Sequence, residues 1–133
     1  FRMWSSLYEE YEPCGTITLE WLRTSSKVWL NIYVADVEDK IAGFIDFVRP
    51  GFHPLPLEDT IYVGELFVKP EYRRRGVGKA LVKKIIQIGR ENRDKWKATR
   101  IVTNAENKAF WENLEFVPMK DSGSQWSHEY SLA

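Results

Sequence analysis

One stretch near the middle of the chain constrains the fold more than any other. A nearly continuous apolar run from Ile61 to Val68 precedes the basic turn Arg73-Arg74-Arg75-Gly76, and an amphipathic segment starts at Val77. Such a run is typical of a strand buried on both faces, and apolar residues at helical spacing predict a helix from Val77 to about Asn92. A buried strand, a glycine turn and a helix N-terminus in this order direct free backbone N–H groups at an anion. The stretch therefore predicts an α/β fold with a site for a diphosphate.

Two common phosphate-binding loops are excluded by the residues around Gly78. A magnesium-nucleotide loop requires a glycine where Arg73 stands, and a Ser or Thr where Ala80 stands. A dinucleotide fingerprint requires a third small residue at the position of Leu81. The pattern that remains is Arg-x-x-Gly-x-Gly, carried by Arg73, Gly76 and Gly78.

This loop resembles the coenzyme A loop of the GNAT-type N-acetyltransferase superfamily, and a downstream segment extends the likeness. Asn104 lies seven residues before Trp111, the spacing at which the superfamily has Asn and Tyr. The segment Leu114-Glu115-Phe116 stands where Leu-Gly-Phe is usual. The resemblance implies a single acetyltransferase domain over residues 1–133. Either the superfamily's first strand is missing before Phe1 or the sheet begins one strand later. The implied fold is α/β (α+β), with a mixed, mostly antiparallel sheet, a splayed central strand pair and flanking helices.

By the same resemblance, acetyl-CoA is the expected cosubstrate, and no metal is expected. The pantetheine arm would enter a gap between the strand ending at Val68 and a strand over Trp96–Thr103, by strand addition. The backbone N–H of Phe67 would stabilise the oxyanion. Trp111 replaces the superfamily's Tyr, and its indole is no usable acid for the departing thiolate. The residues expected to bind the cosubstrate are Leu66, Phe67, Val68, Arg73, Arg74, Arg75, Gly76, Val77, Gly78, Lys79, Ala80, Asn104 and Trp111.

Two side chains have both a chemical and a structural interpretation. Glu65 is a carboxylate within an apolar strand, which is costly unless the group is paired or functional. Burial would raise the pKa of Glu65 toward the range of a general base, so we expect it to receive the amine proton or to orient the ammonium. A structural acid paired with an arginine is the alternative. Asn104 would contact the cofactor arm or cap the following helix.

The composition narrows the partners. Nineteen Lys and Arg residues balance nineteen Asp and Glu residues, and this neutrality argues against a general nucleic-acid binder. A single cysteine and the lack of a membrane-length apolar run indicate a cytoplasmic protein without a membrane partner. The expected partner is an amine acceptor, either a small molecule or a protein amine, and a homodimer stays open.

Periodicity predicts the other elements. Apolar residues at helical spacing predict two N-terminal helices, over Met3–Tyr11 and Thr18–Thr24. The remaining predictions are a hairpin of strands Val28–Val37 and Ile41–Val48, a loop over Arg49–Asp59, a short helix over Lys108–Leu114, and closing strands over Phe116–Lys120 and Ser127–Leu132.

Together these features predict an N-acetyltransferase that moves the acetyl group of acetyl-CoA to a primary amine by direct attack in a ternary complex. The alternative is a non-catalytic coenzyme A-binding or regulatory module, which Trp111 leaves open.

Overall fold

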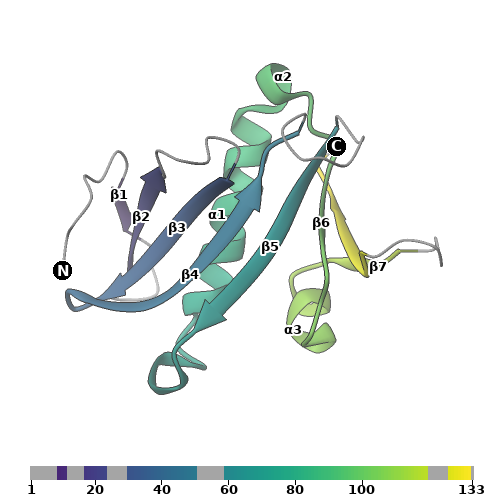
Figure 1. Ribbon diagram of the computed structural model, residues 1–133. Coiled ribbons are helices and arrows are strands. Elements are labelled where there is room, and N and C mark those ends of the chain that lie inside the picture. The colour runs from purple at the N-terminus through teal and green to yellow at the C-terminus, as the bar shows by residue number, and fades with distance from the viewer. Residues whose placement is uncertain (1–8, 12–16, 24–29, 51–58, 120–125, 133) are drawn as a thin grey trace.

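A computed structural model describes residues 9–11, 17–23, 30–50, 59–119 and 126–132 (Figure 1). The strands among them form one sheet in the order β1-β2-β3-β4-β5-β6-β8-β7. All neighbouring strands are antiparallel except β5 and β6, which run parallel. The predicted fold, a mixed and mostly antiparallel sheet flanked by helices, is confirmed. The strands are β1 (Glu9–Tyr11), β2 (Ile17–Arg23), β3 (Leu30–Val37), β4 (Lys40–Val48), β5 (Thr60–Val68), β6 (Arg100–Thr103), β7 (Val117–Pro118) and β8 (His128–Ser131).

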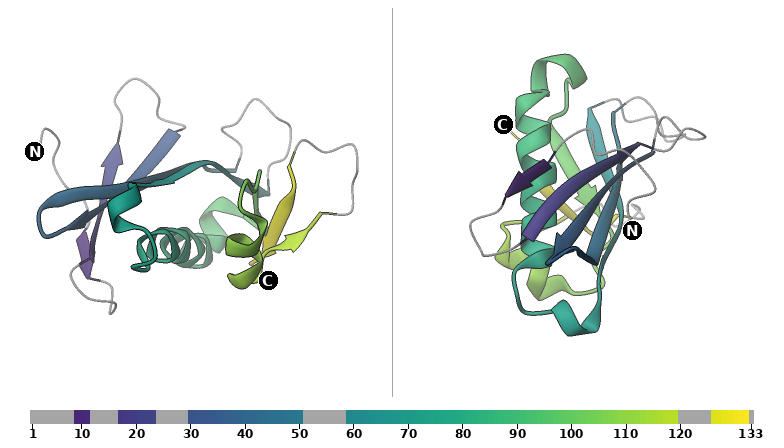
Figure 2. Two further views of the ribbon diagram at one scale, coloured as in Figure 1. Left: turned by 90° about the horizontal axis from the view of Figure 1, so that it is seen from below. Right: turned by 90° about the vertical axis from the view of Figure 1, so that its left-hand side faces the viewer.

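The main helix covers one face of this sheet (Figure 2). It is α1 (Val77–Glu91), which packs apolar residues such as Leu81 and Ile85 against the core. Gly89 brings the helix close to the sheet, because a Cβ there would lie 3.1 Å from Ile61 and Leu132 side-chain atoms. The other helical elements are the 3-10 turn η1 (Pro70–Tyr72), α2 (Arg93–Trp96) and α3 (Lys108–Asn113). Within the described part of the chain, no helix is long and apolar enough to cross a membrane.

The predicted N-terminal helices are wrong where the structure describes them. Ile17–Arg23 is strand β2, paired with β3 along its whole length, and Glu9–Tyr11 is strand β1. Apolar and polar residues alternate from Ile17 to Trp21, which is the period of a strand, and this outweighs the helical spacing of two leucines. Residues 1–8 lie outside the described residues.

Within the described residues, the other predicted elements agree with the structure apart from one boundary. The predicted hairpin is β3–β4, whose two-residue turn Glu38-Asp39 has positive φ angles of 52° and 66°, as a tight hairpin turn requires. The prediction of a strand from Trp96 is wrong, because Trp96 ends α2 and Lys97 turns the chain with φ 55°. The strand β6 starts only at Arg100. The predicted loop at Arg49–Asp59 falls mainly on residues 51–58, outside the described residues.

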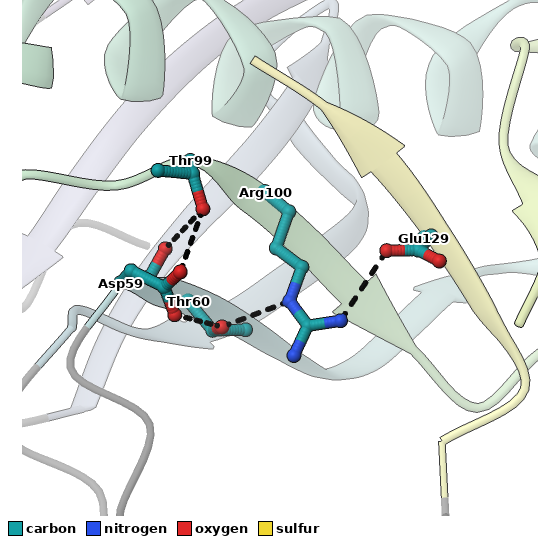
Figure 3. Close-up of polar contacts among 5 residues, drawn as sticks. All are labelled: Asp59, Thr60, Thr99, Arg100 and Glu129. Atoms are coloured by element: carbon teal, nitrogen blue, oxygen red, sulfur yellow. Dashed lines mark hydrogen bonds and ion pairs between the residues drawn. The ribbon is translucent and has the colours of Figure 1, made fainter. Parts of the chain in front are cut away.

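A polar network joins the beginnings of β5 and β6 (Figure 3). Thr99 Oγ1 donates to Asp59 Oδ2 at 2.8 Å, and Arg100 Nε donates to Thr60 Oγ1 at 3.1 Å. Arg100 also forms an ion pair with Glu129 of β8, with 3.3 Å between Nη1 and Oε1. The hydrogen bond from Thr99 is the main reason that the pKa of Asp59 lies below its ordinary value. This network holds three strands together at what we call the closed end of the β5–β6 pair.

Candidate active site

The β5–β6 pair opens at its other end. Pairing stops at Val63 opposite Thr103, while β5 continues to Val68 beside β4 alone. In Figure 1 the two strands diverge towards the bottom of the view, and we call this the open end. A cleft of about 700 Å³ lies there. Its lining residues are Gly64, Glu65, Leu66, Phe67, Val68, Tyr72, Arg73, Arg74, Gly76, Val77, Gly78, Lys79, Thr103, Asn104, Glu106, Asn107, Phe110 and Trp111.

The N-terminus of α1 opens into this cleft and is built to hold an anion. Gly76 precedes the helix with φ 83°, a left-handed conformation that disfavours side chains, and no side chain caps the helix. The first intrahelical hydrogen bond runs from Ala80 N–H to Gly76 O at 2.9 Å. The N–H groups of Val77, Gly78 and Lys79 therefore have no intrahelical acceptor. They carry the positive end of the helix dipole, which favours a phosphate.

The three arginines before α1 differ in their surroundings. Arg73 Nε donates to Val68 O at 3.0 Å, which ties the turn to the end of β5. The Arg75 guanidinium lies 5.6 Å from the centre of the Tyr72 ring and does not line the cleft. Arg74 lines the cleft from a left-handed backbone position, φ 63°. Arg73 and Arg74 are thus placed to face an anion, whereas Arg75 packs on an aromatic ring.

The near wall of the cleft is the free edge of β5. Lys69 N–H donates to Ala42 O on β4 at 2.8 Å, and Phe67 faces Phe44 in the same ladder. Because backbone direction alternates along a strand, the Phe67 N–H points toward β4 and not toward the cleft. Leu66, one residue earlier, directs its N–H and C=O at the free edge. The N–H that faces the cleft is therefore that of Leu66, and not that of Phe67, which was the expected oxyanion donor.

A bulge in β5 brings two acids together at this wall. Val63 faces Phe47 and Leu66 faces Ile45, so Gly64 and Glu65 both lie opposite Asp46 of β4. The prediction that Glu65 is buried is wrong, because the bulge turns this side chain out and leaves it exposed. Asp46 is the more buried of the two acids, being half-buried, and desolvation raises the pKa of Asp46 from 3.8 to about 6. Gly64 lies in this bulge.

The far wall carries the predicted residues Asn104 and Trp111. Asn104 is exposed at the cleft and does not cap α3, because Asn107 Oδ1 accepts the Phe110 N–H at 3.2 Å. Trp111 is buried and meets the rings of Phe110 and Phe116 edge-on, with ring centres 5.4 and 4.9 Å away. Trp111 therefore closes the cleft as an apolar wall, and its indole adds no acid.

A chain of polar contacts fastens this far wall to β8. The Ala105 N–H donates to Ser127 Oγ at 2.8 Å, and Ser127 Oγ lies 2.9 Å from His128 Nδ1. His128 Nε2 in turn lies 2.8 Å from Glu112 Oε2 on α3. The chain holds both the turn after β6 and α3 in place beside the cleft. The sequence contains no spacing that predicts this contact between β8 and α3, because it depends on the tertiary structure.

The structure brings nearly all predicted cosubstrate residues to one cleft. Arg75 and the buried Ala80 are the two predicted residues that do not line it. The cleft combines an anion site at α1 with an extended free strand edge and an apolar far wall. A Cβ at Gly78 would lie 3.3 Å from the Phe110 ring, so the glycine keeps the entrance to the anion site open. These residues fit a diphosphate that carries a narrow, amide-bearing arm, as coenzyme A does.

Comparison with known proteins agrees with this geometry. Residues 2–116 match the sequence model of the Acetyltransferase (GNAT) family. The match covers most of the chain, and the chain therefore belongs to this family, as the loop and the Asn104 segment predicted. By sequence it is similar to human N-acetyltransferase 8, with 36% identity over 59 residues. That alignment covers 44% of this chain and 26% of the relative, so the chain spans about a quarter of the relative's length.

Solved structures share the fold. PaiA N-acetyltransferase from Thermoplasma acidophilum, in complex with coenzyme A, is 18% identical and has a TM-score of 0.61. The match covers 82% of this chain and 65% of that one. The KacTA–DNA complex contains a chain that is 19% identical, with a TM-score of 0.65 and coverage of 77% and 68%. At these identities the likeness shows the fold.

Proposed function

We propose that this protein transfers the acetyl group of acetyl-CoA to a primary amine, by direct attack in a ternary complex. The observation that carries the proposal is that the anion site of α1 and the free edge of β5 lie in one cleft. A diphosphate at the first N–H groups of α1 leaves a pantetheine arm to extend along β5. The coenzyme A in the related PaiA structure supports the same choice of cosubstrate.

Some residues of the cleft would bind the cosubstrate, and others would stabilise the reacting groups. The first-turn N–H groups of α1, with Arg73 and Arg74, hold the diphosphate, and each hydrogen bond to a charged group contributes about 1.5–3 kcal/mol. The arm pairs with Leu66 and Val68 at the edge of β5, as an added strand would. The Leu66 N–H then lies where it can stabilise negative charge on the acetyl oxygen.

The acceptor amine approaches from the face of the sheet that α1 leaves open. Asp46 and the bulge residue Glu65 lie on that face, so an ammonium is attracted there before it loses its proton. Glu65 is exposed and suited to orient a cation. The class of amine is set by contacts beyond these two acids.

A turnover screen tests the proposal. The purified protein is mixed with acetyl-CoA and a panel of amines that includes N-terminal peptides, lysine peptides, polyamines and aminoglycosides, and free thiol release is measured. We expect release that depends on one amine class, with acetyl-CoA binding confirmed by calorimetry. Binding without turnover on the panel would contradict the catalytic proposal and favour the non-catalytic coenzyme A-binding module, which Trp111 without an acid supports. The absence of binding would contradict both.

A further inference from the structure

We infer that Asp46 is the residue that accepts the proton of the attacking amine. This inference rests on the proposed acetyl transfer and adds the group that completes it. Nothing in the sequence motifs singles out this residue, because it belongs to β4 and is far in sequence from the coenzyme A loop and from β5.

The position of Asp46 follows from the bulge. Ile45 and Phe47 belong to the core that α1 covers, so Asp46 between them points to the opposite face. Two residues of β5, Gly64 and Glu65, lie opposite this one residue of β4. Both of these residues line the cleft. A pantetheine arm that starts at α1 and follows β5 would end beside Gly64 and Glu65. Asp46 lies directly behind this part of the cleft wall.

Gly64 leaves room for the Asp46 carboxylate at this wall. A Cβ at residue 64 would clash with Asp46 Oδ1, so the carboxylate occupies the space that a side chain at this position would fill. Oδ1 accepts the Glu65 N–H at 2.9 Å, which fixes the orientation of the carboxylate. Within the described part of the chain, Oδ2 accepts no hydrogen bond. One carboxylate oxygen is thus held by the backbone, and the other is left to take a proton.

The electrostatics suit a proton acceptor. The pKa of Asp46 is raised to about 6, and desolvation is the largest cause. The hydrogen bond from the Glu65 N–H lowers this pKa, and the charge of Glu65 raises it. Glu65 is the charged group that faces Asp46 from β5. On β3, the residue opposite Asp46 is the apolar Ile32. At pH 7 a carboxyl of this kind is ionised by roughly ten to one, close to the optimum for a base at that pH.

The acetyl transfer needs one proton acceptor and one leaving group. As the amine nitrogen forms the new C–N bond to the acetyl carbon, one N–H proton passes to Asp46 Oδ2. The C–S bond of the thioester breaks, and its electron pair leaves with the sulfur as coenzyme A thiolate. Water protonates the thiolate, and Asp46 returns its proton to the solvent.

Kinetics of Asp46→Asn separate this role from a purely structural one. Asn keeps an oxygen that can accept the Glu65 N–H, so it preserves the bulge and removes only the base. We expect kcat/KM for the amine to fall by roughly 100- to 1,000-fold, as for the loss of a general base, while the KM for acetyl-CoA stays within about 3-fold. In the wild type, the slope of log kcat/KM against pH steepens by one unit below about pH 6. In Asp46→Asn this steepening disappears.

Two further variants sharpen the result. Glu65→Gln removes the neighbouring charge, so the inflection moves to lower pH and stays visible. Asp94→Asn, an exposed position on α2, removes an equivalent carboxylate away from the cleft and leaves rate and profile unchanged.

Each outcome decides the matter. Retention of both rate and inflection in Asp46→Asn overturns the inference and leaves the proposed function standing. If Asp46→Asn fails to fold, the Glu65→Gln profile decides, and an inflection that does not move contradicts a base at Asp46. A wild type that binds acetyl-CoA without turnover on the amine panel overturns the inference together with the proposed function.

Discussion

The β5–β6 pair has a closed end and an open end, which differ in what occupies their backbone and side-chain polar groups. At the closed end, Thr60 and Arg100 face each other in the ladder, and Asp59, Thr99 and Glu129 complete a polar network. At the open end, β5 beyond Val63 has no described strand on that side, and its edge and the α1 N-terminus face a cleft. At the closed end the polar groups are paired with one another, whereas at the open end backbone groups of β5 and α1 have no strand or cap as partner within the described residues.

The open end offers the largest expected effect. In Gly76→Val a β-branched residue must occupy φ 83°, so the turn changes shape and the first N–H groups of α1 lose their common direction. Losing one hydrogen bond to a charged group costs about 1.5–3 kcal/mol, so the dissociation constant of coenzyme A should rise roughly 10- to 100-fold by calorimetry.

Glu115→Val is the matched control for Gly76→Val. It places the same residue at another left-handed position, φ 72°, outside the cleft. Coenzyme A affinity should stay unchanged in this control, even where its Tm falls. Equal loss of affinity in the two variants would show that backbone strain, and not the anion site, causes the effect.

The closed end should respond in stability and not in binding. Arg100→Met removes the hydrogen bond to Thr60 and the ion pair with Glu129 but keeps an apolar side chain. We expect the free energy of unfolding in urea to fall by about 1–2 kcal/mol, since the Arg100 side chain is partly buried. Coenzyme A affinity should stay within about twofold. The exposed Lys95→Met on α2 is the control. A large loss of affinity in Arg100→Met would mean that the two ends are coupled.

Ionisation of Asp46 should lower the stability of the folded protein at the open end. Its folded-state pKa is raised to about 6 from 3.8, so the folded protein disfavours the ionised form, and stability falls as pH rises from about 4 through 6. Asp46→Asn should therefore be more stable at pH 8, by about 1 kcal/mol once solvent screening is allowed for, and equal to wild type at pH 3. Thermal unfolding at both pH values measures this. A gain at pH 3 equal to that at pH 8 would mean that packing, not ionisation, is responsible.

Ionisation of Asp59 at the closed end should instead raise the stability of the folded protein, and this is the smallest expected effect. Its folded-state pKa is lowered, so its contribution to stability is present above the ordinary pKa of 3.8 and is lost as pH falls through the lower folded value. Asp59→Asn should be a few tenths of a kcal/mol less stable at pH 6, because exposed contacts are weak, and this difference should shrink at pH 2.5. Urea titrations at the two pH values compare the proteins. A difference that does not depend on pH would contradict the assignment.

The sequence predicted the region from Ile61 to Trp111 far better than the N-terminal part. Its apolar strand, glycine turn and helix lie close together in the chain, so local periodicity and glycine positions carry the information. The helix predicted over β2 is wrong because two leucines at helical spacing are weaker evidence than pairing with β3, which the sequence does not display. The expected burial of Glu65 is wrong for a related reason, because one inserted residue reverses the direction of a side chain.

By itself, the sequence determined the family, the anion loop and the residues of the far wall, because these depend on residue types at short, fixed spacings. Tertiary structure alone decided which backbone groups face the cleft, and these include the N–H of Leu66 but not that of Phe67. It also brought Asp46 against Gly64, which is eighteen residues away in the chain. The physical reason is that strand register and bulges, set by long-range pairing, determine where each polar group points, and no local pattern encodes that register.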